Sequence, residues 1–304
     1  MKRPDAIPNV FHFVFGLKQQ TEPLHLMHYL CLASCIEVNQ PEEVHFHYFH
    51  EPHGEWWERI APRLRLRRIE PDRLVSDYNY GDTSLARYRY AHLADVARLQ
   101  ILLHEGGIYA DIDTLFLRPI PEDWFSRQHV LGQENAPTGA TESLCNAWIA
   151  SRPGSEFCRR WLDGMADAFD GSWSNHSTLL PCRLAHQYPE LISVEPKCSF
   201  YPVDHTPREI NDLFHKNIHL PETAYSLHLW NHLWFDRQRT DFSHFHAGLL
   251  TVDYLLFAKT TYAMAARRFL PADVSGSRLA YLRQRAASAI RHPQLAGLTW
   301  FGQR

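Results

Sequence analysis

The chain has 304 residues, of which 45% are hydrophobic and 21% charged, so it is long and apolar enough for a large folded core and is not a disordered chain. Its formal net charge of −3 excludes a general electrostatic attraction to nucleic acid. No stretch approaches the roughly 20 apolar residues of a membrane span, and the first residues form no apolar signal segment, so we expect a cytoplasmic protein.

The first part of the chain predicts strands that alternate with helices. Residues 10–15 and 44–49 are rich in β-forming residues, and an apolar stripe between them predicts a helix that starts near Thr21. In the second strand, His45 and His47 alternate with aromatic residues. We expect one imidazole face there rather than a zinc cluster, because zinc ligands usually come from converging elements.

A long helix is predicted over residues 84–105, and two glycines stop it before a short apolar strand that leads to Asp111 and Asp113. In an extended backbone, residues two apart face the same side, so these carboxylates would lie together. Carboxylates this close repel unless a cation or proton lies between them, and Mg²⁺ or Mn²⁺ is a natural partner. On the preceding helix, Asp95 and Arg98 share a face. The alternatives are a simple turn for the aspartates and a structural ion pair for the helical residues.

The second half of the chain is less regular. Strands are predicted over residues 129–133, 200–203 and 225–229, helices over 155–169 and 178–188, and either a strand or a helix start over 144–150. The alternation of strands and helices predicts an α/β sheet.

The end of the chain differs in charge from the rest. Residues 262–304 hold seven arginines and one acidic residue, Asp273, and therefore carry +6, which leaves −9 for the remainder. We expect a main body over residues 1–260 and a basic helical extension over residues 261–304. An amphipathic helix is predicted from Ser277, and two roles stay open: it lies on an anionic membrane surface, or it packs against the body with its arginines in solvent.

Four blocks of the chain, in this order, resemble the family of glycosyltransferases with a "sugar-binding region containing DXD motif". This family includes yeast-type α-mannosyltransferases, α-1,4-galactosyl- and α-1,4-N-acetylglucosaminyltransferases, bacterial capsule and lipopolysaccharide transferases and, more remotely, clostridial glucosylating toxins. The blocks are IPNVFHFVFG at 7–16, Asp95 and Arg98 with GGIYADID at 106–113 and LRPI at 117–120, NAWIAS at 146–151, and SLHLWNH at 226–232.

The resemblance implies a GT-A type α/β fold, with a Rossmann-like mixed sheet flanked by helices, to which this chain adds its basic helical C-terminal appendage. It implies a metal-dependent retaining glycosyltransferase that takes a nucleotide sugar, UDP-linked by expectation, uses Mn²⁺ or Mg²⁺, and forms an α-glycoside on a glycan or lipid-linked acceptor. It further suggests a bacterial enzyme of surface-polysaccharide biosynthesis, in the cytoplasm or peripheral at the inner face of the membrane.

The resemblance also implies roles for particular residues. Asp113 and Asp111 would ligate the metal, and His228 is the first candidate for a further ligand. The donor would contact Asp111 and residues spread over all four blocks: Phe13, Phe15, Asp95, Arg98, Tyr109, Trp230 and Asn231. Asn146 would lie near the donor sugar, and Glu134 is the only carboxylate placed to act as a nucleophile. A front-face mechanism, in which the departing phosphate takes the acceptor proton, needs no such residue.

Two other function classes stay open at this point. One is a different divalent-metal enzyme, a phosphoesterase or nucleotidyltransferase that uses Asp111 and Asp113 as ligands. The other is a non-catalytic protein that binds sugar nucleotides. The first usually needs further clustered His or Asp motifs, and the second would not require both aspartates.

Overall fold

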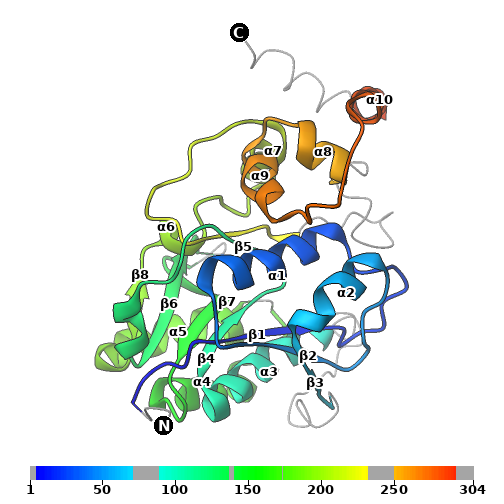
Figure 1. Ribbon diagram of the computed structural model, residues 1–304. Coiled ribbons are helices and arrows are strands. Elements are labelled where there is room, and N and C mark those ends of the chain that lie inside the picture. Colours follow the sequence, from blue (N-terminus) through cyan, green and yellow to red (C-terminus); the bar gives the residue numbers. More distant parts are fainter. Residues whose placement is uncertain (1–4, 71–88, 137–139, 173, 232–249, 292–304) are drawn as a thin grey trace.

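The computed structural model of the protein describes residues 5–70, 89–136, 140–172, 174–231 and 250–291 (Figure 1). A mixed sheet of seven strands, in the order β3-β2-β1-β4-β7-β6-β8, forms its centre. The strands of this sheet are β1 (Val10–Phe15), β2 (Glu43–Tyr48), β3 (Arg65–Arg68), β4 (Gly107–Ala110), β6 (His129–Glu134), β7 (Ser143–Ser151) and β8 (Ser193–Glu195).

The sheet is parallel on one side and mixed on the other. β1 runs parallel to β2 and β4, and β2 runs parallel to β3. β7 is antiparallel to its neighbours β4 and β6, and β8 is parallel to β6. Two further strands, β5 (Thr114–Phe116) and β9 (Ser226–His228), form a separate antiparallel pair. The expected α/β class with a Rossmann-like mixed sheet is confirmed.

Helices cover both faces of the sheet (Figure 1). On one face lie α1 (Leu26–Asn39) and α2 (Glu55–Ile60), and on the other lie α3 (Arg89–Glu105), α4 (Glu156–Ala168) and α5 (Leu180–Gln187). Two buried hydrophobic clusters match the two faces, the larger one including α1 and the smaller one including α3 and α4. Because the central strands are covered on both sides, VFHFVF in β1 is almost wholly buried.

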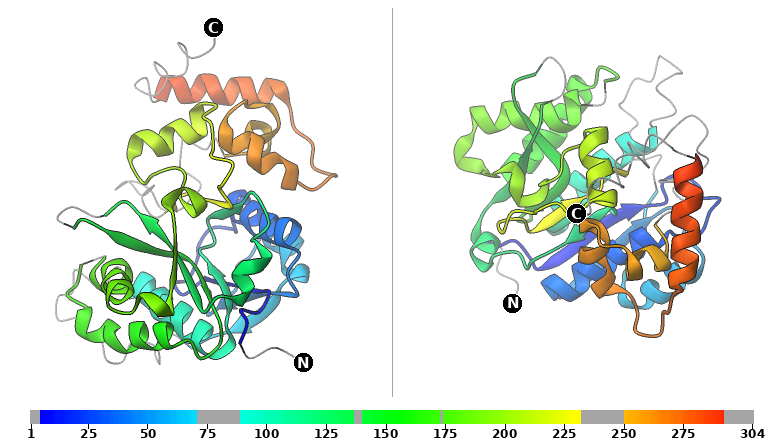
Figure 2. Two further views of the ribbon diagram at one scale, coloured as in Figure 1. Left: turned by 90° about the vertical axis from the view of Figure 1, so that its left-hand side faces the viewer. Right: turned by 90° about the horizontal axis from the view of Figure 1, so that it is seen from above.

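Further helices lie beyond α1, on the side away from the sheet, and Figure 2 shows them from two other directions. They are α7 (Pro207–His215), α8 (Val252–Phe257), α9 (Thr261–Ala266) and α10 (Arg278–Arg291); the short α6 (Lys197–Phe200) instead packs on β6 and β9. Buried Tyr262, Ala263 and Phe269 belong to the same cluster as α1. We therefore propose that the extension begins after Phe269, later than the expected boundary at 260/261.

The basic helix α10 packs on α8. Gln284 lies 3.0 Å from Thr251 at the start of α8, and the backbone N–H of Ser277 donates to Asp253 (2.6 Å). Leu279 and Leu282 stay half exposed. Within the described ranges, no helix has the length and apolar character needed to cross a bilayer.

Most predicted elements are present, with two informative differences. Residues 200–203, predicted as an edge strand, do not form one: Phe200 ends α6, and an irregular segment follows. The strand β3, RLRR, was not predicted, because its exposed arginines hide the β pattern. Residues 144–150 form a strand, and the start of the helix predicted from residue 84 lies outside the described residues.

Candidate metal and substrate site

A cavity of about 1480 Å³ opens where β1 and β4 end, and Trp230 and Asn231, which follow β9, line its far side. All but one of the residues predicted for the site line it; they are Phe15, Asp95, Arg98, Tyr109, Asp111, Asp113, Glu134, Asn146, His228, Trp230 and Asn231. The exception, Phe13, lies fully buried in the hydrophobic core.

Strand pairing explains how the two aspartates meet His228. After β4 the chain turns, with the N–H of Thr114 donating to the carbonyl of Asp111 (3.0 Å), and then enters β5. In the β5–β9 ladder, Thr114 pairs with His228, and the N–H of Leu229 donates to the carbonyl of Asp113 (3.0 Å). The ladder therefore places the imidazole beside the acidic turn.

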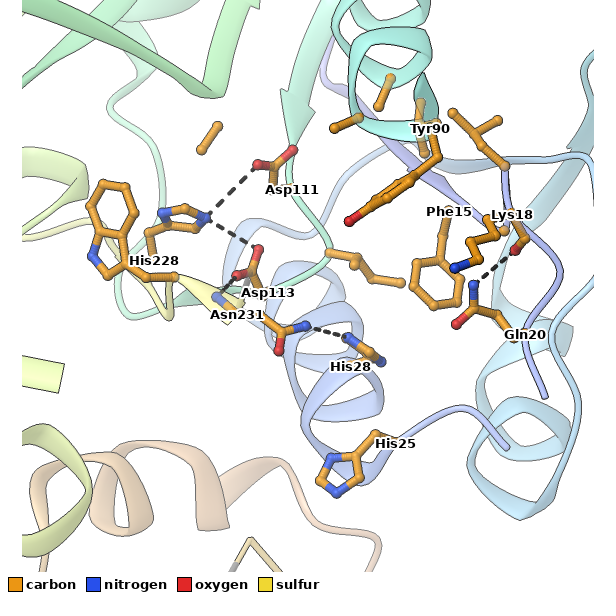
Figure 3. Close-up of a pocket in the computed structure, with 18 of the residues that line it drawn as sticks. Phe15, Lys18, Gln20, His25, His28, Tyr90, Asp111, Asp113, His228 and Asn231 are labelled. Atoms are coloured by element: carbon orange, nitrogen blue, oxygen red, sulfur yellow. Dashed lines mark hydrogen bonds and ion pairs between the residues drawn. The ribbon is translucent and has the colours of Figure 1, made fainter. Parts of the chain in front are cut away.

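The three side chains converge in Figure 3. Nε2 of His228 lies 3.2 Å from Oδ1 of Asp113 and 3.8 Å from Oδ2 of Asp111. The other oxygen of Asp113, Oδ2, accepts a hydrogen bond from the backbone N–H of Asn231 (2.7 Å). One potential ligand atom of each of the three residues lies within 4.8 Å of the others.

This arrangement fits a divalent cation. Nε2 of the buried His228 is directed at the carboxylates of Asp113 and Asp111, and its Nδ1 has no hydrogen-bond partner among the described residues. Burial alone would lower the pKa of His228, but Asp113 and then Asp111 raise it above its ordinary value. Burial raises the pKa of Asp111, an effect that Arg98 opposes and Asp113 reinforces. Two carboxylates and an imidazole are a ligand set suited to Mn²⁺.

Arg98, on α3, connects the acidic groups of the cavity. Its guanidinium lies 3.0 Å from Asp95, 3.3 Å from Asp111 and 2.7 Å from the carbonyl of Asn146, and it stacks on the ring of Tyr109. The Tyr109 hydroxyl donates to Asp111 at 2.6 Å. Burial opposes the charge of Arg98, yet the pKa of Arg98 is raised, with Asp111 the largest of the groups that raise it.

Asp95 is held from two further sides. The Asn146 amide donates to Oδ1 of Asp95 (2.8 Å), and Nε2 of the buried His176 lies 3.3 Å from Oδ2. His176 belongs to a short π-helix, Asn175–Leu179, before α5. It was not predicted for the site, because nothing in the local sequence indicates a contact with a helix 81 residues away.

Aromatic rings line other walls of the cavity. Phe15 and Tyr90 lie across the cavity from His228 in Figure 3. Since the fully buried Phe13 packs in the core on the sheet face that α1 covers, only Phe15 of the predicted pair faces the cavity. The Trp230 indole lies against His228, with ring centroids 4.4 Å apart, and donates to the carbonyl of Val203 (2.9 Å).

Trp230 has a backbone φ of 53°, a left-handed conformation that is uncommon for a large side chain. The next residue, Asn231, uses its backbone N–H for Asp113 and places its side-chain amide 3.4 Å from Nε2 of His28. Glu134 lines another part of the cavity and accepts from the hydroxyl of Ser143 at 2.7 Å. The unusual turn at Trp230 thus aims a backbone donor at the acidic pair.

Comparison with known proteins relates this chain to glycosyltransferases. Residues 36–134 match a family model described as "Glycosyltransferase sugar-binding region containing DXD motif". The chain is 34% identical over 246 residues to "Glucan organizing enzyme 1" of Cryptococcus neoformans var. grubii serotype A, which covers 76% of this chain and 64% of that protein. It is 27% identical over 191 residues to human "Alpha-1,4-N-acetylglucosaminyltransferase", covering 57% of this chain and 52% of that protein.

The chain thus spans less than two thirds of the length of either protein. Among solved structures it resembles "PaToxG Glycosyltransferase", with 18% identity, 60% of this chain and 70% of that chain covered, and a TM-score of 0.46.

Proposed function

Because residues 36–134 belong to the family of glycosyltransferases with a sugar-binding region containing a DXD motif, we propose that this protein transfers a sugar from a nucleotide sugar to a hydroxyl of a glycan or glycolipid acceptor. The observation that carries the proposal is the convergence of Asp111, Asp113 and His228 beside a cavity large enough for such a donor.

In the proposed site, Asp113, Asp111 and His228 hold Mn²⁺ or Mg²⁺. When bound, this ion would neutralise the charge that gathers on the diphosphate as the bond to the sugar breaks. The backbone N–H of Asn231 fixes one oxygen of Asp113, which leaves Oδ1 directed at His228 and the cavity. The Phe15 ring lies across the cavity and is the proposed stacking surface for the base, which we take to be uracil.

We propose that Asp95 and Asn146 face the hydroxyls of the donor sugar or ribose, and that Arg98 keeps both in place. Arg98 is suited to this because a guanidinium presents several donors in a fixed plane and stays charged. Its contacts are to Asp95, Asp111 and the Asn146 carbonyl, so it orients the acidic groups from the side away from the donor. Tyr109 and Trp230 complete the proposed donor site, one on Asp111 and the other on His228.

The proposed transfer retains the α configuration. A double displacement would use Glu134, the carboxylate that reaches the cavity from β6, as the nucleophile beneath the sugar. The alternative front-face reaction passes the acceptor proton to the departing phosphate. A Glu134→Gln variant separates the two: lost turnover supports the double displacement, and retained turnover with unchanged product stereochemistry supports the front-face reaction.

The relatives guide the choice of donor and acceptor. The name of the human relative specifies α-1,4 transfer of N-acetylglucosamine, so UDP-N-acetylglucosamine is the first donor to examine. Both relatives come from eukaryotes, so they lend no support to a bacterial surface-polysaccharide role. The proposed acceptor is therefore a glycan without further specification, and a membrane-peripheral location is not part of the proposal.

The experiment that tests the proposal is a screen of UDP- and GDP-sugars with Mn²⁺, Mg²⁺ or EDTA, read by chromatography of the products. We expect nucleoside diphosphate to appear with one donor class and a divalent ion, and Asp113→Asn to abolish it. The matched control is Asp163→Asn, an exposed acid on α4, which should behave as the parent.

The products also separate the alternative functions. A phosphoesterase that hydrolyses the diphosphate would release sugar phosphate and nucleoside monophosphate. A nucleotidyltransferase would release sugar phosphate only when an acceptor such as added pyrophosphate takes the nucleotidyl group. A binding protein would show donor-dependent thermal stabilisation without any product. Full turnover by Asp113→Asn would overturn the proposed metal site.

A further inference from the structure

Outside the cavity, three imidazoles meet inside the protein. His12 lies on β1, and His45 and His47 lie on β2. The parallel register places His12 beside His45 and Val14 beside His47, so the three rings share one face of the sheet. They are 0%, 4% and 3% exposed, and none of them lines the cavity. The alternating histidines of β2 predicted only an imidazole face. The neighbouring strand β1 adds His12, so that rings from two strands converge.

The ring nitrogens of the cluster are close enough to share an ion. Nδ1 of His12 lies 3.1 Å from Nε2 of His47. One nitrogen from each of the three rings lies within 4.8 Å of the other two. In a tetrahedral site with zinc–nitrogen bonds of about 2.0–2.1 Å, ligand atoms are roughly 3.3 Å apart. The separation of His12 and His47 already matches this spacing, and the nitrogen of His45 lies at most 4.8 Å from either of them.

The outward-facing nitrogens are held as they are in metal sites. Nε2 of His12 lies 2.9 Å from the carbonyl of Gly106, and Nε2 of His45 lies 2.6 Å from a carboxylate oxygen of Glu43. A metal-bound histidine almost always donates its other ring N–H to a carbonyl or carboxylate, which fixes the ring and the tautomer. These contacts leave Nδ1 of both rings for the interior of the cluster.

A carboxylate contacts one ring of the cluster and is the candidate for a fourth ligand. Glu105, the last residue of α3, places Oε2 3.2 Å from Nδ1 of His45. The side chains of Glu105 and Glu43 are 43% and 44% exposed, so the buried imidazoles lie one side chain away from solvent. An ion therefore has a short entry path along Glu105.

We propose that His12, His45 and His47 bind a structural zinc ion through Nδ1, Nδ1 and Nε2, with the Glu105 carboxylate as the fourth ligand. Imidazole nitrogens and carboxylate oxygens are both zinc ligands, and four protein ligands would leave no open position for substrate.

The zinc would connect elements that shape the cavity. β1 continues from His12 to Phe15, and α3 carries Asp95 and Arg98 above the same sheet. An ion bound to β1, β2 and the end of α3 would fix the positions of these elements relative to one another from outside the cavity. The proposal is independent of the proposed function, because neither the ligands nor their contacts take part in the cavity.

The test measures zinc directly in the folded protein. The full chain carrying Asp113→Asn, which removes the metal site of the cavity, is given one equivalent of Zn²⁺ and dialysed against metal-free buffer. Metal content and competition with a chromogenic chelator are then recorded. We expect one tightly held zinc per chain, and a rise in melting temperature on adding Zn²⁺ to the metal-free protein. Substituted Co²⁺ should show the intense visible bands of a tetrahedral site.

Variants of the cluster distinguish a zinc site from a hydrogen-bonded histidine cluster. His47→Gln should lose the zinc and the Zn²⁺-dependent rise in melting temperature. Glu43→Gln, a change at a partly exposed residue that folding should tolerate, should weaken zinc binding about 10–100-fold by releasing His45. The controls are His104→Gln, an exposed neighbour on α3, and His186→Gln, which disrupts the separate group Glu142, Cys182 and His186. Both should keep the zinc.

Two outcomes would overturn the proposal. The folded Asp113→Asn protein could hold no zinc above the level of a chelator-washed blank, in which case the histidines form only a hydrogen-bonded cluster. Alternatively, zinc could stay bound in both His47→Gln and Glu43→Gln, in which case the ion lies elsewhere. Neither outcome bears on sugar transfer, which is measured separately in the protein without the Asp113 substitution.

Discussion

Arg98 is the residue on which the polar contacts of the cavity converge. It contacts Asp95, Asp111 and the carbonyl of Asn146 at once, and only a planar fork reaches all three. We predict that Arg98→Lys, which keeps the charge, lowers turnover about 100-fold by misplacing the acidic groups and the free energy of unfolding by about 2 kcal/mol. Donor turnover and urea denaturation measure the two effects.

The control for this prediction is Arg59→Lys. Arg59 also contacts two acids, Glu55 and Asp273, but does so on the surface, where such pairs contribute little. Turnover by Arg98→Lys equal to that of Arg59→Lys would contradict the role assigned to Arg98.

Phe13 and Phe15 share a strand but differ in surroundings, which predicts opposite phenotypes. Phe15→Ala should raise the KM for the donor roughly 10-fold through lost base stacking, with a smaller loss of stability than Phe13→Ala because Phe15 is only partly buried against the core. Phe13→Ala should lower the free energy of unfolding by about 3–5 kcal/mol, because it empties a fully buried position. Each variant is the other's control. If Phe13→Ala changed KM and Phe15→Ala did not, the assignment of the two rings would be reversed.

His129 predicts an acid sensitivity that does not involve the site. It is fully buried beside Phe157 and Trp161, and burial lowers its pKa to about 3. The unfolded chain takes up this proton near pH 6.5 and the folded protein does not, so stability falls as the pH drops below 6.5. The loss reaches about 2 kcal/mol by pH 5.

His129→Leu, of similar volume, should flatten this part of the stability profile and leave stability at pH 7 equal or higher. Denaturation curves at pH 5 and pH 7 measure the effect. An unchanged difference between the two pH values would show that His129 is not the cause.

At the scale of elements, the sequence predicted those whose patterns are strong and local. The apolar run of β1, the amphipathic α4 with its Ser155 cap and the stop of α3 at two glycines are all where the sequence placed them. α1 begins at Leu26, later than expected, because the cap is His25 and not a residue near Thr21. Residues 200–203 were wrongly predicted as a strand because they are mostly apolar. Their side chains are largely buried, but an apolar run of this kind is found in buried coil as well as in strands.

Gly107, the first residue of β4, has a backbone requirement that predicts a large effect of a small change. Its φ is 104°, and a Cβ there would lie 2.5 Å from the carbonyl of Val10. Gly107→Ala should therefore lower the free energy of unfolding by roughly 3 kcal/mol, from backbone strain and from the clash. Gly154→Ala is the matched control, because Gly154 also has a positive φ but has open space around it. It should lose only about 1 kcal/mol. Equal losses in guanidinium denaturation would refute the clash.

At the scale of the whole molecule, the sequence located the main parts of the candidate site but not how they are joined. The Asp-x-Asp turn and the segment around His228 were each recognised. The β5–β9 ladder that joins them was not predicted, because strands of three residues are too short to show a periodic sequence pattern. His176 and the histidine cluster were missed for the same reason. Both depend on contacts between segments that local periodicity does not connect.

The packing of α10 predicts that the basic end of the chain is dispensable for the chemistry. Its Gln284 contacts Thr251, a cavity-lining residue at the start of α8, but none of the described residues of α10 itself lines the cavity. Removing residues 278–304 should leave donor turnover unchanged and lower the melting temperature by only a few degrees. Sedimentation with anionic vesicles, with and without these residues, determines whether the helix also contacts membranes. A large loss of turnover on soluble substrates would contradict the prediction.

The pairing of β9 with β5 has a consequence for the order of events during synthesis. Asn231 and Asp113 are 118 residues apart in the sequence, yet the backbone N–H of Asn231 donates to the Asp113 carboxylate. A nascent chain that has released only its first two hundred residues from the ribosome has the acidic turn without its imidazole. Such an intermediate lacks one of the three proposed manganese ligands. The proposed metal site would therefore form only when β9 pairs with β5.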